Sequence, residues 1–300
     1  MNSHLKRGTS AVWFRRLARG KRILDRIRLS GLPGGALVMR FTKKHLFAGI
    51  LESEYPVIRL KGLDLTIPRR FIPHFVHRDY EPVTVGAFLA AVERGSTVVD
   101  VGAHIGYFSC LAALASGPRG TVHAVEPCPT NAQLLRQNLR LNGIENVVVH
   151  EVAAAGVRTR RAFRVTHSSD SHGFYEHPLA TTVMAIEIEG VPLDALVKDR
   201  ATVIKIDVEG AEIEVLSGMV RLLRISRGAT VIIEWNPGCL MMAGRGPMEL
   251  PRMLERLGVR DLVVLDDHSG KTRSLREVEE EIAAGRTPPG WYVNLRGRVA

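Results

Sequence analysis

The chain has 300 residues, of which 45% are hydrophobic and 24% are charged. These values are typical of a globular protein and exclude a disordered or fibrous chain. A helix that spans a membrane needs an apolar run of roughly 18 residues, and because the sequence has no run of that length we expect no membrane-spanning helix. The three cysteines, Cys110, Cys128 and Cys239, lie far apart in the sequence, which excludes a disulfide framework and a zinc cluster and leads us to expect a cytoplasmic protein.

The net charge of +10 is concentrated at the N-terminus. Residues 1–45 hold twelve Lys and Arg against one acid, Asp25, a net charge of +11 that leaves −1 for the other 255 residues. We therefore expect a basic N-terminal arm over residues 1–35 that meets acidic lipid or phosphate. Residues 11–29 place their apolar side chains at helical spacing, which suits an amphipathic helix lying peripherally at the inner membrane face. The alternative is a solvated helix or a frayed terminus.

Residues 36–95 contain four prolines, and we expect them to form a lead-in or cap region. Over residues 96–300 the pattern changes to alternating strands and helices, as in the short apolar run of residues 97–101. The alternation predicts βαβ units on a twisted, mostly parallel sheet with helices on both faces. The expected strands are residues 97–101, 121–125, 147–149, 202–206, 230–233, 262–265 and 291–295, and the expected helices are 105–115, 130–141, 211–223 and 248–257.

The first expected strand runs into a turn that contains glycine, Asp100-Val-Gly-Ala-His-Ile-Gly106. Ligands of a parallel sheet bind beyond the carboxyl ends of its strands, where a tight turn at Gly102 and a helix N-terminus offer backbone N–H groups to an anionic ligand. His104 occupies the position of the middle glycine in a dinucleotide fingerprint, which disfavours NAD. The alternative is a plain strand-to-helix turn.

Glu126 directly follows the second expected strand, 24 residues after Gly102. A carboxylate at this offset can accept hydrogen bonds from both hydroxyls of a ribose. Together the two features predict a nucleoside-binding site. The alternative for Glu126 is a capping acid before Pro127.

A third segment, Lys205-Ile-Asp-Val-Glu-Gly-Ala-Glu212, carries alternating charges. In an extended chain, Lys205, Asp207 and Glu209 point to one side. Charged groups on a central strand are costly unless they face a ligand cleft or pair with one another. The segment therefore predicts an active-site edge, with a salt-bridged strand end as the alternative.

These segments, taken in order, resemble the FkbM-type family of S-adenosylmethionine-dependent methyltransferases. The resemblance covers roughly residues 85–240 and does not extend to the basic arm. It implies a Rossmann-like class I methyltransferase fold of the α/β class, with a seven-stranded sheet whose last strand is antiparallel. The similar blocks are residues 98–109, 123–127 and 204–212, together with residues 191–194 and 232–237.

The resemblance also implies S-adenosylmethionine as the cofactor. Gly102, His104 and Gly106 would form the loop under its methionine end, Glu126 would hold the ribose, and Asp207 would lie at the active-site mouth beside the methyl donor. The segment from Glu151 to Ala153 would lie near the adenine. The predicted cofactor-binding residues are Asp100, Gly102, Ala103, His104, Gly106, Glu126, Glu151, Ala153 and Asp207.

An alcohol acceptor is a poor nucleophile near neutral pH, so a base beside it accelerates transfer. Asp207 is the first candidate for this catalytic role, followed by His104 and Glu209. Glu234 ends the following strand and would extend an acidic cluster with Asp207. Carboxylates of this kind bind Mg²⁺, so Mg²⁺ stays an open alternative although we assign no metal ligand.

The expected function is O-methylation of a hydroxyl on a sugar, glycolipid or other secondary metabolite. One alternative is an RNA methyltransferase that grips phosphate with the basic arm, although only 6% of residues are aromatic and no stacking platform is visible. Another is a non-catalytic membrane-surface protein with a nucleoside-binding fold. The polar segment 167–177 is a candidate acceptor lid, with a solvated loop as the alternative. The acceptor and the oligomeric state cannot be read from the sequence.

Overall fold

The chain divides into two compact units, residues 1–78 and residues 79–300. The computed structural model describes residues 55–68, 80–168 and 171–300. The basic arm (residues 1–35), with its expected amphipathic helix, lies outside the described residues, as does much of the lead-in region (residues 36–95). The domain boundaries stay predictions.

The described part of the first unit is a β-hairpin. Strands β1 (Val57–Leu60) and β2 (Leu63–Thr66) pair antiparallel. The turn residues Lys61 and Gly62 have φ angles of 47° and 89°. A two-residue turn with both φ angles positive matches the right-handed twist of the flanking strands.

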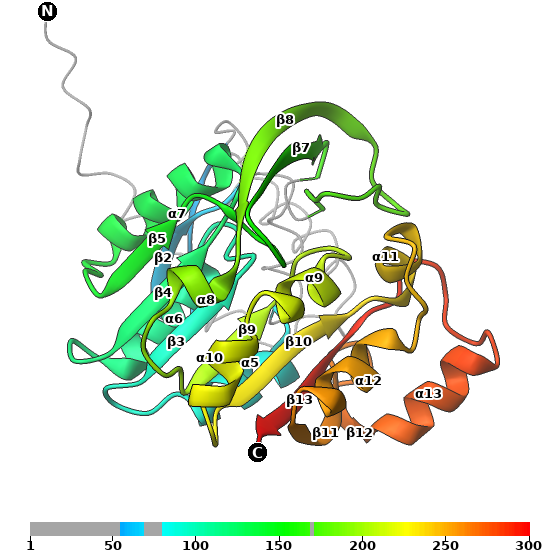
Figure 1. The fold of residues 1–300 in the computed structure, drawn as a ribbon. Coiled ribbons are helices and arrows are strands. Elements are labelled where there is room, and N and C mark those ends of the chain that lie inside the picture. Colours follow the sequence, from blue (N-terminus) through cyan, green and yellow to red (C-terminus); the bar gives the residue numbers. More distant parts are fainter. Residues whose placement is uncertain (1–54, 69–79, 169–170) are drawn as a thin grey trace, which may run out of the picture. The chain divides into compact units, whose positions relative to one another are not determined.

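The second unit is built on an eight-stranded sheet in the order β12-β11-β13-β10-β9-β3-β4-β5 (Figure 1). Strands β5, β4, β3, β9 and β10 are parallel to one another. Strand β13 is antiparallel to both of its neighbours, β10 and β11. This order confirms the Rossmann-like class I methyltransferase fold, including the antiparallel last strand. The strands are β3 (Thr97–Val101), β4 (Thr121–Val125), β5 (Val147–His150), β9 (Val203–Ile206), β10 (Thr230–Trp235), β11 (Val259–Asp266), β12 (Lys271–Ser274) and β13 (Val293–Val299).

The sheet has one strand more than the seven predicted. The additional strand, β12, pairs antiparallel with β11 at the edge of the sheet. Its sequence, Lys-Thr-Arg-Ser, contains no apolar residue, so hydrophobic patterning gives no signal for it. The expected strands 97–101 and 121–125 are confirmed residue for residue, because both lie buried in the middle of the sheet.

Helices cover both faces of the sheet, as predicted. On one face, Val99 and Ile204 belong to the same core as Leu216, Leu222 and Leu254 of the covering helices. These helices, with α8, lie in front of the sheet in Figure 1, and α5 lies behind it. Among the described helices, none is both long and apolar enough to span a bilayer. The helices are α5 (Pro82–Ala91), α6 (Tyr107–Ser116), α7 (Pro129–Leu141), α8 (Leu193–Leu196), α9 (Glu212–Ser217), α10 (Val220–Ile225), α11 (Pro237–Met242), α12 (Glu249–Arg256) and α13 (Leu275–Ala283).

The helix predicted over residues 211–223 is two helices, α9 and α10. The chain breaks at Gly218, where an added Cβ would lie 2.1 Å from the carbonyl oxygen of Ala155. The break therefore depends on a contact that is distant in sequence, and helical periodicity alone does not reveal it.

A three-stranded sheet of order β6-β8-β7 is inserted after β5, and it was not among the predicted elements. It consists of β6 (Ala153–Ala154), β7 (Thr159–Thr166) and β8 (Thr182–Val191). In Figure 1, β7 and β8 form a twisted ribbon above α9. The ion pair of Arg161 on β7 with Glu214 on α9, at 2.8 Å, ties the insertion to the carboxyl end of the main sheet.

Candidate functional site

The turn after β3 can accommodate only glycine at position 102. Gly102 has a φ of 80°, and an added Cβ would lie 1.7 Å from the carbonyl oxygen of Asp207. The amides of Gly102 and Ala103 both donate to the carbonyl oxygen of Val125, at 2.9 and 3.1 Å. The turn thus brings the ends of β4, β3 and β9 together at one edge.

The second glycine of the turn, Gly106, makes room for a neighbouring helix. An added Cβ would lie 2.9 Å from Cγ of Leu135, so the close approach that requires glycine is to helix α7 and not to the strand. Gly106 has a φ of 85° and precedes the first residue of α6. Between the glycines, His104 also has a positive φ, of 51°.

Glu126 is buried behind this turn, with 4% of its surface exposed. One carboxylate oxygen accepts the amide of His104 at 2.8 Å, and the other accepts the amide of Cys128 at 2.9 Å and the Asn131 side chain at 3.4 Å. Burial raises the pKa of Glu126 to about 7, although these hydrogen bonds oppose the shift. Cys128 directly precedes helix α7, so the hydrogen bond from its amide gives Glu126 the capping role that the sequence left as an alternative. The bond to His104 holds the turn after β3 in place.

Asp100 and Lys205 lie opposite each other on β3 and β9 and point away from the core that contains Val99 and Ile204. Asp100 accepts a hydrogen bond of 2.6 Å from the Ser109 hydroxyl, and its other oxygen has no partner among the described residues. Asp100 thus lies beneath α6, and burial raises its pKa. Its predicted contact with the cofactor stays a prediction.

Lys205 is an almost fully buried lysine, with 2% of its surface exposed. Its Nζ lies 2.9 Å from Asp207 Oδ2 and 4.5 Å from the centre of the Phe108 ring. Burial lowers the pKa of Lys205, but the neighbouring carboxylates, led by Asp207 and Glu81, raise it further than burial lowers it. The ammonium group is therefore charged, and the salt-bridged strand end that the sequence left as an alternative is present.

The alternation expected from Lys205 to Glu209 ends at Asp207. Strand β9 stops at Ile206, and Glu209 has a φ of 54°, which turns the chain out of the extended conformation. The carboxylate of Glu212 accepts the amides of Gly210 at 3.1 Å and Val208 at 3.3 Å and so braces this turn. Despite the turn, carboxylate oxygens of Asp207, Glu209 and Glu234 all lie within 4.8 Å of one another.

The inserted segment adds a residue that the sequence analysis did not single out by itself. His177 Nε2 lies 3.5 Å from Glu209 Oε2, and the Cys239 thiol lies 3.3 Å from the same oxygen. An added Cβ on Gly173 would lie 3.5 Å from the Glu209 carbonyl oxygen, so the segment packs closely on the turn. Segment 167–177 was predicted as an acceptor lid. The contact of its His177 with Glu209 makes His177 a candidate site residue. The lid itself stays a prediction.

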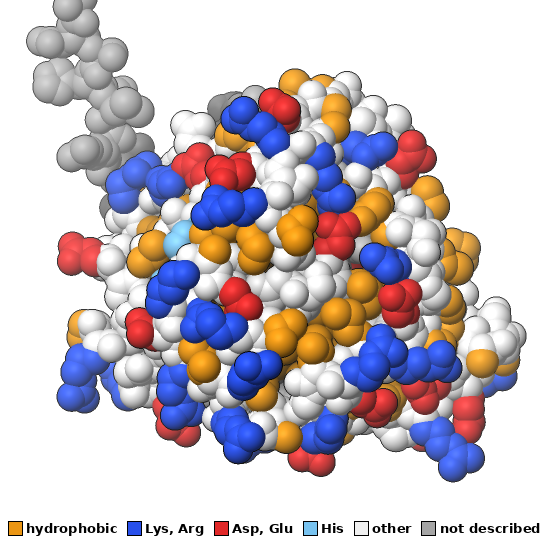
Figure 2. All heavy atoms as spheres, viewed as in Figure 1, with side chains coloured by type: hydrophobic (Ala, Val, Ile, Leu, Met, Phe, Trp, Pro, Cys, Tyr) orange, Lys and Arg blue, Asp and Glu red, His pale blue; other side chains and the backbone are white. Residues whose placement is uncertain are grey.

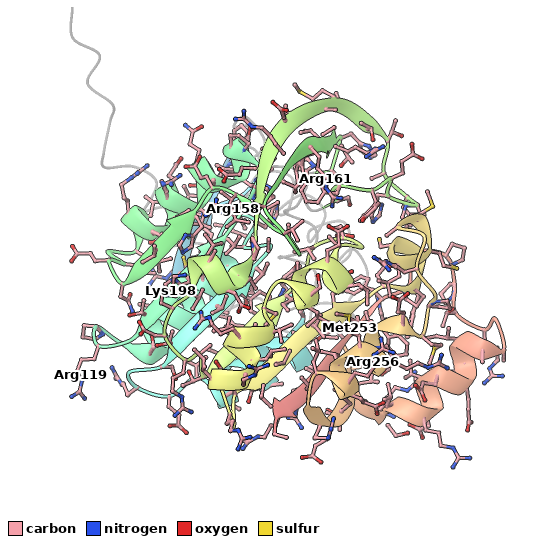
Figure 3. All side chains as sticks on the ribbon, viewed as in Figure 1. Arg119, Arg158, Arg161, Lys198, Met253 and Arg256 are labelled. Carbon is pink, nitrogen blue, oxygen red and sulfur yellow. The ribbon has the colours of Figure 1, made fainter. Side chains whose placement is uncertain are left out.

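Arg161 supports this segment from strand β7 (Figure 3). Its guanidinium lies 3.7 Å from the centre of the Phe174 ring and pairs with Glu214, which also accepts the Tyr175 hydroxyl. The insertion is therefore anchored on the same side of the sheet as the turn that carries Glu209.

The two predicted adenine-side residues, Glu151 and Ala153, lie in different surroundings. Glu151 is 44% exposed and forms an ion pair with Arg136 on α7. Ala153 is buried in a small cluster with Phe163 and Phe174. Both follow β5 at the carboxyl edge of the sheet, and their predicted contact with adenine stays a prediction. His104, a predicted base, donates its backbone amide to Glu126, and its catalytic role also stays a prediction.

The surface charge of the described residues gives no support to a phosphate-binding groove on the face that carries α8, α10 and α12. Figure 2 shows Lys and Arg side chains interspersed there with Asp and Glu and with apolar side chains. Arg119, Arg158, Lys198 and Arg256 lie spread over this view in Figure 3. This agrees with the near-zero net charge of the chain beyond residue 45.

Comparison with known proteins identifies one family model. The model of the FkbM methyltransferase domain matches residues 100–257, which is more than half of the chain and includes Gly102, Glu126, Asp207 and Glu234. The match begins close to the start of the glycine turn and ends after helix α12.

Two curated relatives are protein-L-isoaspartate O-methyltransferases. The one from Aeropyrum pernix is 42% identical over 132 residues, which are 42% of this chain and 47% of the relative. The one from Methanococcoides burtonii is 32% identical over 97 residues, which are 32% of this chain and 43% of the relative. The chain thus spans about half the length of the curated relatives it matches.

A solved structure of a methyltransferase FkbM from Methylobacillus flagellatus is also similar. It is 20% identical, with a TM-score of 0.43, and the similarity covers 76% of this chain and 59% of that chain. The fold assignment rests on the strand order and on the family match.

Proposed function

The chain belongs to the FkbM methyltransferase family, and we propose that it transfers the methyl group of S-adenosylmethionine to a hydroxyl of a sugar, glycolipid or other secondary metabolite. The observation that carries this proposal is the meeting of three adjacent strand ends. The turn at Gly102, the carboxylate of Glu126 and the carboxylate of Asp207 follow β3, β4 and β9, which are neighbours in the sheet.

These groups fit the cofactor. An ionised carboxylate only accepts hydrogen bonds, which suits Glu126 to the two hydroxyl donors of a ribose. The adjacent turn carries no side chain at Gly102 and is locked by its contact with Asp207. Residues 100–106 would hold the methionine end, Glu126 the ribose, and Glu151 with Ala153 the adenine side.

S-adenosylmethionine supplies an activated methyl group. The chain must therefore chiefly align the acceptor hydroxyl and remove its proton, and alignment alone contributes several kcal/mol, roughly 7 or more in well-oriented systems. Asp207, Glu209 and His104 are the proposed bases, and His177 would position the Glu209 carboxylate through the contact between them. A carboxylate within hydrogen-bond reach of the hydroxyl is suited to take that proton. Segment 167–177 would cover the acceptor.

Calorimetric titration with S-adenosylhomocysteine tests the cofactor part of the proposal. We expect micromolar binding by the native chain, no comparable binding of NADH, and at least about tenfold weaker binding by Glu126→Ala, because one good pair of charge-assisted hydrogen bonds is lost. Glu145→Ala, at an exposed glutamate outside the site, is the matched control and should bind as the native chain does. Because burial raises the pKa of Glu126 to about 7, native affinity should rise between pH 6 and pH 8 as the acceptor carboxylate ionises.

A screen with labelled S-adenosylmethionine then tests the acceptor. Incorporation into a glycan or glycolipid, retained after mild base that cleaves methyl esters, supports transfer to a hydroxyl. Label that base releases from protein, or label found in RNA, would overturn the hydroxyl acceptor while leaving methyl transfer intact. Absence of S-adenosylhomocysteine binding would overturn both.

A further inference from the structure

We propose that Asp207, Glu209 and Glu234 form a binding site for a divalent cation of the Mg²⁺ or Mn²⁺ type. The three residues come from two neighbouring strand ends. Ile206 of β9 lies opposite Ile233 of β10, so the residues that follow them lie side by side, Asp207 directly after β9 and Glu234 near the end of β10. One oxygen from each of the three carboxylates lies within 4.8 Å of the other two.

Glu234 is the residue that points to a ligand. Glu234 is only 6% exposed, and its carboxylate oxygen Oε2 has no hydrogen-bond partner among the described residues. A buried carboxylate oxygen without a partner is costly. Its nearest carboxylate neighbours repel it, and a cation between them would remove both costs.

The charges around Glu234 are unbalanced. The ammonium of Lys205 pairs with Asp207 at 2.9 Å. The buried carboxyls of Glu81 and Asp100 also act on Lys205, and those of Glu81 and Glu212 act on Glu234, so one buried lysine faces an excess of acids. The two positive charges of a divalent cation would compensate the pair formed by Glu209 and Glu234.

The donor set favours a hard cation. All three ligands are carboxylate oxygens, which Mg²⁺ and Mn²⁺ prefer, and Mg²⁺ completes its six positions with water or substrate oxygens. A second set, His177, Glu209 and Cys239, has similar spacing. There, Nδ1 of His177 accepts the Leu179 amide at 3.1 Å, which places the imidazole proton on Nε2, facing Glu209. An imidazole nitrogen that carries a proton cannot bind zinc, so this set is a hydrogen-bonded group.

The role of the cation rests on the proposed function. Bound beside Asp207, it would coordinate the acceptor hydroxyl and lower the pKa of that hydroxyl, which assists removal of its proton. With the cation bound, Asp207, Glu209 and Glu234 would act as ligands, and His104 would remain as the proposed base.

Binding is tested without activity, by titrating Mn²⁺ into the full-length chain after chelator treatment and following the free Mn²⁺ signal by electron paramagnetic resonance. We expect one saturable site with a Kd below about 1 mM. Glu234→Gln should weaken it at least about tenfold, the cost of disturbing a metal site. Glu145→Gln, at an exposed glutamate outside both the cluster and the proposed cofactor site, is the control and should bind Mn²⁺ as the native chain does.

Thermal unfolding separates a lost ligand from a misfolded variant. In the absence of metal, Glu234→Gln should unfold at the same temperature as the native chain or higher, because glutamine keeps the shape of the side chain and removes its repulsion by the neighbouring carboxylates. Mn²⁺ should raise the unfolding temperature of the native chain and of Glu145→Gln but not of Glu234→Gln. No saturable binding to the native chain, or equal binding by Glu234→Gln, would overturn the site. Binding of S-adenosylhomocysteine to the same samples shows separately whether the proposed function holds.

Discussion

The loop after β3 approaches the loop after β9 closely at Gly102. An added Cβ would lie 1.7 Å from the backbone oxygen of Asp207, and neither backbone can yield without disturbing its own strand. We expect Gly102→Ala to lower the free energy of unfolding by roughly 3 kcal/mol or more, the sum of left-handed strain and overpacking. Chemical denaturation measures the loss.

Gly143→Ala is the matched control for this prediction. Gly143 has a φ of 63°, but no atom lies within 4 Å of its added Cβ. It should cost only about 1 kcal/mol, from backbone strain alone. Equal losses at the two glycines would mean that the approach of the Asp207 loop does not determine the need for glycine.

At the scale of single residues, the sequence predicted the place of a side chain where that residue comes directly after a strand. Glu126 and Asp207 lie where the strand ends predicted them, because a parallel sheet fixes which residues leave it at the carboxyl edge. The contact of His177 with Glu209 spans 32 positions of sequence and depends on how the insertion folds back, which no local pattern encodes. The family resemblance placed Glu151 near the adenine, which stays a prediction, and in the structure its side chain pairs with Arg136.

Helix α10 shows how one element depends on a side chain from another. Its own N-cap residue, Met219, makes no side-chain cap. Asp194 at α8 supplies the missing acceptors, because its carboxylate accepts the amides of Arg221 at 2.9 Å and Leu222 at 2.7 Å. Asp194 belongs to one of the blocks on which the family resemblance was based, and this structural role accounts for it without a ligand.

We expect Asp194→Ala to lower the free energy of unfolding by about 1–2 kcal/mol, the range for loss of a helix cap. Binding of S-adenosylhomocysteine should be unchanged, since α10 lies on the opposite side of β9 from Lys205 and Asp207. Asp199→Ala removes an exposed aspartate close in sequence and is the control. An unfolding free energy for Asp194→Ala equal to that of Asp199→Ala would contradict the capping role.

At the scale of elements, apolar patterning predicted the strands that are buried, and it did not predict the strands that are exposed or polar. The central strands are buried on both faces and are mostly apolar, and they were found from the sequence. Strand β12 is polar, and strands β7 and β8 carry exposed positions along much of their length, so their pairing depends on tertiary contacts. The break between α9 and α10 likewise follows from the contact of Gly218 with Ala155.

At the scale of the whole molecule, the strand order could be predicted because connection rules act on the entire chain. Alternating strands and helices with right-handed crossovers leave few arrangements, and the family resemblance selects among them. The edge strand and the insertion escape these rules, since neither changes the order of the central parallel strands.

The basic arm dominates the charge of the molecule, and we propose that it holds the protein at an anionic membrane surface, where a glycolipid acceptor would lie. Each basic residue near such a surface contributes about 1 kcal/mol. Changing Arg15, Arg19 and Arg22 to Glu in the full-length chain should therefore weaken flotation with phosphatidylserine vesicles by about 3 kcal/mol, more than about a hundredfold. Changing the exposed Arg119, Lys198 and Arg256 to Glu alters the net charge equally and is the control. If both triple variants lose binding alike, or neither does, the arm is not the membrane contact, because only a local effect at the arm separates them.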